Sequence, residues 1–241
     1  MTSNQLKPEA THRWGKVKKP AEITETRLVK AILDGYFPIN SFLPGERELA
    51  DTLGVTRPTL RETLQRMERD GWVEIHHGKP TRVRDYWNEG SLGVLNTLAC
   101  HPEHLPNNFI PDLLTVRLAM APTYTAMAVE KAPEEITLLL EGRHNLADDP
   151  QAFAYFDWQV HHILTRRSEN PVFVMISNGF KDLYLHLAPL YFSIPSACQH
   201  SMQFYQDLSQ AATKCNPSQA KILTEKVMRE SMSFWQQVSI T

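Results

Sequence analysis

The chain has 241 residues, of which 42% are hydrophobic and 22% charged, so it is not a largely disordered protein, and its length suits two domains of about 70 and 150 residues. Its three widely spaced cysteines, Cys100, Cys198 and Cys215, argue against a disulfide framework and against a zinc site built on thiolates. The formal net charge is −2, with 15 basic and 13 acidic residues in positions 1–90 and 10 and 14 in the rest, so any nucleic-acid interface has to be judged from the placement of charges.

The chain opens with a basic segment and shows no targeting signal. Residues 1–19 contain Lys7, Arg13, Lys16, Lys18 and Lys19 without hydrophobic periodicity, which predicts a flexible basic arm able to touch phosphates. The first twenty residues lack the apolar core of a signal peptide, and no later run approaches the roughly 18 apolar residues of a membrane-spanning helix. We therefore expect a cytoplasmic protein with no membrane partner.

Residues 20–87 predict three helices followed by a two-stranded wing. The first helix begins at Pro20, and its apolar stripe is expected to include Leu28, Val29, Ile32, Leu33 and Tyr36. Residues 45–53 form the second helix, and the third begins at a Thr56 cap and runs to about residue 69. Strands at 72–76 and 81–84 join through the tip 77–80, and residues 88–90 read as a linker. This order is typical of a winged helix-turn-helix.

The third helix has one face for the core and an N-terminal end suited to DNA. Leu60, Leu64 and Met67 share the apolar face, while Arg57, Thr59 and Arg61 gather at the start, where a recognition helix meets base edges. The planar fork of arginine can bind the O6 and N7 atoms of guanine. We also expect Arg47 of the second helix to approach the DNA backbone, and the tip residues His77, Gly78 and Lys79 to reach a minor groove.

Beyond residue 90 the pattern is helical throughout and predicts an α-helical domain over 91–241. The expected helices lie near 91–100, 107–130, 134–146, 151–168, 172–193, 198–213 and 217–238, separated by prolines. Pro122 lies inside the second of these and is expected to kink it. The predicted fold class is therefore mainly α, with an N-terminal winged helix-turn-helix and a C-terminal helical bundle.

The stretch LPGERELADTLGVTRPTLRETLQRMERDGWVEIHHGKPTRV resembles the winged helix of the GntR family, and the string HGKPT with the following Trp87 resembles its fatty-acid-responsive FadR branch. Pro58 departs from a second threonine of that motif, so no DNA contact is carried over to it. The resemblance implies a homodimer on a palindromic operator. The DNA contacts that it implies fall on Arg47, Thr56, Arg57, Thr59, Arg61, His77, Gly78, Lys79 and Thr81.

Two kinds of sensing domain follow a GntR winged helix, and one of them binds a metal ion. Asp157 and His161 match the first two ligands of the metal-binding kind and share one helical face. The other two ligand positions fall on Tyr205 and Ser231, and two ligands make a poor transition-metal centre. A metal-dependent sensor of a small carboxylate is the alternative function, and a polar pair in the bundle interior is the plainer interpretation of Asp157 and His161.

The FadR-type bundle, which lacks the metal and binds long-chain acyl-CoA, matches more positions. Arg117 lies on an apolar stripe, where an unpaired guanidinium would be costly unless it meets an anion or a polar cleft. The plainer interpretation is that it snorkels to solvent or pairs with a carboxylate. Met228 stands where the family pattern has a glycine, and its bulk is expected to narrow or reshape the acyl tunnel. Each aromatic position could also be ordinary bundle core. The effector contacts that the resemblance implies are Arg117, Tyr184, Tyr191, Val227, Ser231 and Trp235.

The resulting hypothesis is a transcription regulator that releases its operator when long-chain acyl-CoA binds, with no other cofactor and no bound metal. The resemblance implies repression of fatty-acid degradation genes and activation of genes for unsaturated fatty-acid synthesis. The sequence contains no nucleophile elbow, no phosphate-binding loop and no pair of carboxylates typical of catalysis, so we do not expect an enzyme.

Overall fold

The computed structural model describes residues 19–76 and 78–235, and its internal contacts divide the chain into a first unit ending at Val94 and a second beginning at Leu95. Most of the predicted basic arm, and His77 of the wing, lie outside the described residues. The predicted class is confirmed: helices dominate both units, and the only described sheet has two strands. None of the described helices combines the length and the apolar character needed to cross a lipid bilayer.

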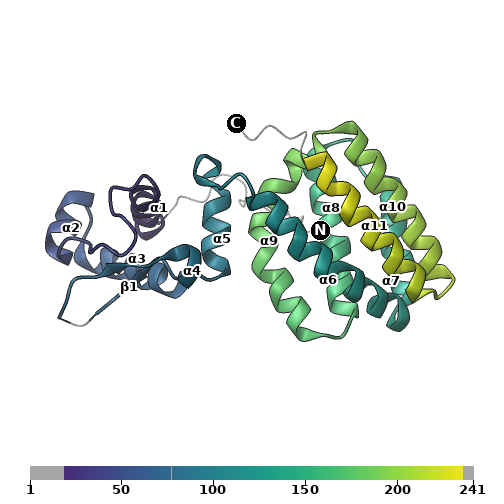
Figure 1. The fold of residues 1–241 in the computed structure, drawn as a ribbon, viewed down its shortest axis with the longest axis horizontal. Helices are drawn as coiled ribbons and strands as arrows, with labels where there is room; N and C mark the ends of the chain where they lie inside the picture. The colour runs from purple at the N-terminus through teal and green to yellow at the C-terminus, as the bar shows by residue number, and fades with distance from the viewer. Residues whose placement is uncertain (1–18, 77, 236–241) are drawn as a thin grey trace, which may run out of the picture. The chain divides into compact units, whose positions relative to one another are not determined.

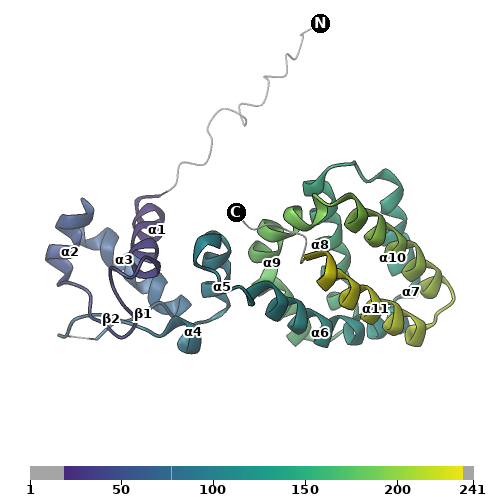
Figure 2. The ribbon, with the colours of Figure 1, turned by 45° about the horizontal axis from the view of Figure 1, so that its top comes forward.

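The first unit is a three-helix fold followed by a short hairpin (Figures 1 and 2). Leu60, Leu64 and Met67 are buried as predicted, together with Trp72, which is 0% exposed. Tyr36 was wrongly placed on the apolar stripe of the first helix, because that helix ends at Leu33 and the Tyr36 side chain is 77% exposed. The elements are α1 (Pro20–Leu33), α2 (Glu46–Leu53), α3 (Arg57–Asp70), β1 (Val73–Glu74), β2 (Arg82–Val83) and α4 (Tyr86–Glu89).

Local sequence explains both ends of α3. Thr56 caps the helix, since its hydroxyl oxygen accepts the backbone N–H of Thr59 at 3.3 Å, and Pro58 occupies the first turn, where its missing N–H leaves no bond unmade. Gly71 ends the helix with φ 99°, a conformation that favours glycine. A Cβ at Gly71 would lie 2.8 Å from the Cα of Gly90 and 3.0 Å from the carbonyl oxygen of Glu89, so this turn also permits a close approach to the end of α4.

The wing strands are shorter than predicted, and a third segment completes them. β1 and β2 are antiparallel, with Val73 opposite Val83 and Glu74 opposite Arg82. On the other side of β2, residues 40–43 form backbone hydrogen bonds with Thr81 and Val83 and a bridge to Arg82. Residues 88 and 89, expected in a linker, instead belong to α4. Their N–H groups bond the carbonyl oxygen of Asp85 and so close a helical turn.

The second unit is entirely helical in its described part, as predicted. Five of its helices begin with proline at the first position, where the missing N–H costs nothing, so these prolines, predicted to separate helices, are helix starts. α6 runs through Pro122 without interruption, and the kink there stays a prediction. The boundary between the units falls within α5 (Leu92–Ala99). The elements that follow are η1 (Pro102–His104), α6 (Phe109–Lys131), α7 (Pro133–Glu141), η2 (Gly142–Asn145), α8 (Pro150–Arg167), α9 (Pro171–Phe192), α10 (Pro195–Thr213) and α11 (Pro217–Trp235).

Small residues let the bundle helices approach closely. α6 packs along α11 and against α8, α8 packs against α9, and α10 packs against α11 and α7 (Figure 1). Ala121 and Ala128 of α6 and Ala220 of α11 are completely buried at these contacts. Asn96 of α5 fixes that helix to α9, because its side chain donates to the carbonyl oxygen of Gly179 and accepts the N–H of Leu183, each at 3.0 Å. The bundle surrounds a cavity whose wall is formed by α6, α8, α9, α10 and α11.

Candidate functional site

The first candidate site is the exposed start of α3 with the residues predicted to accompany it. Arg47, Thr56, Arg57 and Arg61 are exposed, and Thr59 is partly buried by its place in the cap. Arg61 is not free, since its Nε lies 2.7 Å from the Glu46 carboxylate of α2. This ion pair connects the two helices of the helix-turn-helix while leaving the Arg61 side chain 65% exposed.

The wing supplies the other candidate contacts. Gly78 has φ 74°, and both it and Lys79 are exposed, whereas Thr81 is partly buried beside β2. The N–H of Lys79 donates to the carbonyl oxygen of His76 at 3.3 Å and so tightens the turn. The structure therefore presents Lys79 to solvent at the tip. DNA contacts by these residues stay predictions.

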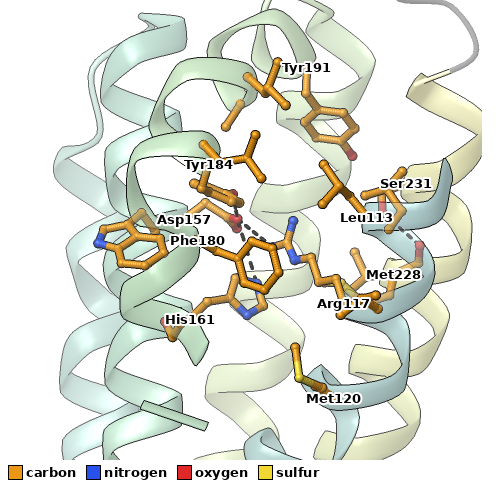
Figure 3. A pocket seen from close by; sticks show the side chains of 18 of the residues that line it. Leu113, Arg117, Met120, Asp157, His161, Phe180, Tyr184, Tyr191, Met228 and Ser231 are labelled. Atoms are coloured by element: carbon orange, nitrogen blue, oxygen red, sulfur yellow. Dashed lines mark hydrogen bonds and ion pairs between the residues drawn. The ribbon is translucent and has the colours of Figure 1, made fainter. Parts of the chain in front are cut away.

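The second candidate site is a cavity of about 150 Å³ inside the bundle. Its wall is mainly apolar and is built by α6, α8, α9, α10 and α11, with Leu113 and Met120 on one side and Phe180 on another (Figure 3). The structure brings all six candidate effector residues to this wall: Arg117, Tyr184, Tyr191, Val227, Ser231 and Trp235. Met228 also lines it and is 4% exposed, and its carbonyl oxygen accepts the Ser231 hydroxyl at 2.9 Å.

A buried carboxylate joins four helices at this cavity. Asp157 of α8 accepts an Nη2 hydrogen bond of Arg117 from α6 at 2.9 Å and a hydroxyl hydrogen bond from Tyr184 of α9, both at Oδ2. Its Oδ1 accepts the hydroxyl of Tyr205 from α10 at 2.7 Å. Arg117 also lies over the Tyr184 ring, with 5.2 Å from its Cζ to the ring centroid. Of the possibilities open for Arg117, the structure shows pairing with a carboxylate.

His161 lies one turn along α8 and completes the polar cluster. Its Nδ1 is 2.8 Å from the Tyr124 hydroxyl, and its Nε2 is 3.8 Å from Asp157 Oδ2, buried and without a hydrogen-bond partner among the described residues. Burial, followed by the Arg117 charge, lowers the pKa of His161 to about 3, so the ring is neutral at neutral pH. Burial alone would raise the pKa of Asp157, but the Arg117 charge and the tyrosine hydrogen bonds hold it below its ordinary value.

These contacts do not fit the alternative metal site. Both oxygens of Asp157 are already acceptors, and one of them faces the Arg117 guanidinium, which would repel a divalent cation. Tyr205 provides a hydroxyl that donates to Asp157, so it does not act as a metal ligand here. Among residues 19–76 and 78–235, no group of three or more His, Cys, Asp or Glu side chains could hold a metal ion. The pair is instead a polar cluster in the bundle interior.

Sequence reasoning missed the central role of Asp157 and the part played by Tyr205. The sequence did contain a signal for Tyr205, because this residue falls on the third ligand position of the metal-binding kind of sensing domain. A side chain at that position points toward Asp157 and His161. Spacing along one helix indicated that Asp157 and His161 share a face. It could not indicate that Arg117, forty residues earlier, pairs with that face.

Comparison with known proteins follows the same division of the chain. Residues 20–83 match the model of the bacterial regulatory proteins of the gntR family, and residues 84–241 match the FadR C-terminal domain. The fatty acid metabolism regulator protein of Shewanella frigidimarina is 40% identical over 222 residues, or 92% of each chain. That of Shewanella pealeana is 41% identical over 220 residues, covering 91% of this chain and 92% of the relative.

A solved structure supports the fold only. Lar, which controls the expression of the Listeria monocytogenes agr system, matches with a TM-score of 0.58 at 16% identity, covering 91% of this chain and 99% of that one. The family assignment confirms the prediction of a transcription regulator rather than an enzyme. The chain belongs to the GntR family of bacterial regulatory proteins and carries a FadR-type C-terminal domain.

Proposed function

We propose that the protein is a DNA-binding transcription regulator of fatty-acid metabolism that releases its operator when a long-chain acyl-CoA enters the bundle. The observation that carries the proposal is the apolar cavity, with all six candidate effector residues on its wall, in a chain that also has a winged helix-turn-helix. Relatives called fatty acid metabolism regulator proteins at 40% identity support the metabolic assignment. Repression of degradation genes and activation of unsaturated fatty-acid synthesis genes are part of the same proposal.

The DNA-binding part rests on the exposed cations of the first unit. Arg47, Arg57 and Lys79 project from α2, from the start of α3 and from the wing tip, where they are available to phosphates and bases. A protein of this kind acts as a homodimer on a palindromic operator, since two-fold symmetry of the protein requires two-fold symmetry of the site.

The effector part rests on the chemistry of the cavity. An acyl chain gains about 0.8 kcal/mol for each methylene that leaves water, so a mainly apolar wall favours a long chain. The described residues satisfy one N–H of Arg117 through Asp157, and its remaining N–H groups can donate to a thioester carbonyl. A hydroxyl at Ser231 offers a second polar contact at the same wall.

A titration tests both parts. A fluorescein-labelled duplex is first selected from a randomised library by the wild-type protein, and its affinity is then measured with palmitoyl-CoA, with CoA alone and with palmitate alone. We expect palmitoyl-CoA to weaken DNA binding by about 5- to 150-fold, the usual range of coupling between two sites, and the two fragments to have little effect. Unchanged affinity with palmitoyl-CoA would contradict the effector part and leave DNA binding intact.

A matched pair of variants on α11 locates the effect. Ser231→Phe places a ring in the cavity wall and should abolish the response to palmitoyl-CoA. Ile222→Phe adds a comparable ring on the same helix at a side chain that is 61% exposed, and should respond as the wild type does. A wild-type response in Ser231→Phe would show that the cavity is not the effector site.

A further inference from the structure

One basic residue of the wing is fully engaged with other side chains. Arg82 lies in β2, with β1 on one side and residues 40–43 on the other. A cation in a wing would ordinarily be taken for a phosphate contact. The Arg82 side chain, however, is only 24% exposed.

The guanidinium of Arg82 has partners on three separate segments. Its Nε donates to the Glu74 carboxylate of β1 at 2.9 Å, and its Nη1 donates to the side-chain oxygen of Asn40 at 2.7 Å. Its Nη2 donates to the Glu89 carboxylate of α4 at 2.9 Å. The planar fork of arginine makes these bonds from three different nitrogens, whereas the three donors of a lysine all radiate from one nitrogen and cannot span the same partners.

The three partners are themselves fixed. Glu74 faces Arg82 directly across the hairpin, and its hydrogen bond from Arg82 holds the pKa of the Glu74 carboxyl below its usual value. Asn40 has φ 65°, and its N–H donates to the carbonyl oxygen of Val83 at 2.9 Å. Glu89 also accepts the N–H of Asp85 at the start of α4. Arg82 thus connects the base of the wing to the loop before α2 and to the helix after the wing.

We propose that Arg82 is a positioning residue for DNA binding: with Glu74, Glu89 and Asn40 it forms a clamp that holds the wing in its binding orientation, and it contacts no phosphate itself. The inference rests on the proposed DNA-binding function. Two carboxylates meet one guanidinium in this clamp, so its net charge is −1 and it repels DNA. Its benefit is preorganisation of Gly78 and Lys79 at the tip.

The direction in which DNA affinity changes when Glu89 loses its charge distinguishes a clamp from a purely electrostatic effect. Glu89→Gln removes a negative charge from a DNA-binding unit, which by electrostatics alone should tighten binding. The clamp requires the opposite result. Arg82→Lys keeps the positive charge and loses the fork, so a phosphate contact would survive this change in large part and the clamp would not.

The experiment measures affinity for the selected duplex across salt concentration, well below the melting temperature of each variant. Arg82→Lys and Glu89→Gln should each weaken binding by about 3- to 10-fold, as expected from lost preorganisation, with an unchanged salt slope. Lys79→Gln should reduce the slope by about 0.9, as expected for a lost phosphate contact. Glu48→Gln is the charge control, because Glu48 is exposed on α2 and forms no ion pair with any described residue.

Several results would overturn the clamp. One is wild-type affinity in Arg82→Lys, and another is tighter binding in Glu89→Gln, to the same extent as in Glu48→Gln. The third is a reduced salt slope in Arg82→Lys, which would make Arg82 a phosphate contact. Lower melting temperatures with unchanged affinity would likewise assign the cluster to stability alone. A wild-type protein that selects no duplex would contradict the proposed function itself and the clamp with it.

Discussion

At Asp157 a single carboxylate accepts hydrogen bonds from side chains of three other helices. Asp157→Asn would leave Arg117 without its counter-charge in the bundle, and we expect a loss of about 3–5 kcal/mol in the free energy of unfolding. Urea unfolding measures the change. The control is Asp182→Asn, at an exposed carboxylate of α9, which should change stability by less than about 0.5 kcal/mol.

A double variant tests whether the loss comes from the stranded charge. Arg117→Met with Asp157→Asn removes both ions, so it should be more stable than Asp157→Asn alone. If the losses in the free energy of unfolding caused by the two substitutions simply add, Arg117 and Asp157 do not stabilise one another. The loss in Asp157→Asn would then come from the hydrogen bonds with the tyrosines.

His161 predicts a particular dependence of stability on pH. Its pKa is about 3 in the folded protein and about 6.5 in an unfolded chain, so between these values the unfolded state binds the extra proton. Stability therefore falls as pH drops from about 6.5 toward 3, by up to about 1.4 kcal/mol per pH unit from this residue. His161→Asn should flatten the difference between unfolding at pH 6.5 and at pH 4.5. If His161→Asn leaves the pH profile unchanged, His161 has the same pKa in the folded protein as in the unfolded chain.

Residue-scale sequence reasoning was sound where one helix suffices. The spacing of Asp157 and His161 fixed their common face, and the apolar neighbours of Arg117 indicated that it needs a partner. The identity of that partner depends on how α6 meets α8, and Tyr205 comes from a third helix. Such contacts between distant segments leave no local pattern.

At the scale of elements, the turn at Gly71 allows a sharp comparison with the turn at Gly35. Both have positive φ, but a Cβ at Gly35 would meet nothing within 4 Å, whereas one at Gly71 would meet the backbone of residues 89 and 90. Gly35→Ala should cost about 1–2 kcal/mol from backbone strain alone. Gly71→Ala should cost clearly more, as measured by urea unfolding. Equal losses would show that the end of α4 moves away at little cost.

Prolines and glycines made most element ends predictable, and their chemistry explains the errors. A proline ends one helix pattern but also suits the first position of the next helix, which is why α10 starts at Pro195, three residues before its predicted start. The pairing of residues 40–43 with β2 was not predicted, because it is made by backbone atoms of a segment without alternating polarity. The role of Arg82 was not predicted either, because its side-chain partners come from separate segments of the chain.

For the whole molecule, the two units should respond to different ligands. Palmitoyl-CoA at a hundred times its dissociation constant should stabilise the unit it binds by about 2.7 kcal/mol. Hydrogen exchange should therefore slow in α6, α8, α9 and α11 with palmitoyl-CoA, and in α2 and α3 with the selected duplex. Protection by palmitoyl-CoA that is confined to α1–α3 would place its site outside the bundle.

The size of the cavity has a kinetic consequence. A space of about 150 Å³ accommodates a group the size of benzene, and a long acyl chain is several times larger. The helices around it must therefore separate before or while the chain enters. Association with palmitoyl-CoA should then be slower than diffusion, and if opening comes first its rate should level off as ligand concentration rises. The small volume of the cavity would in that case set how quickly the regulator can respond.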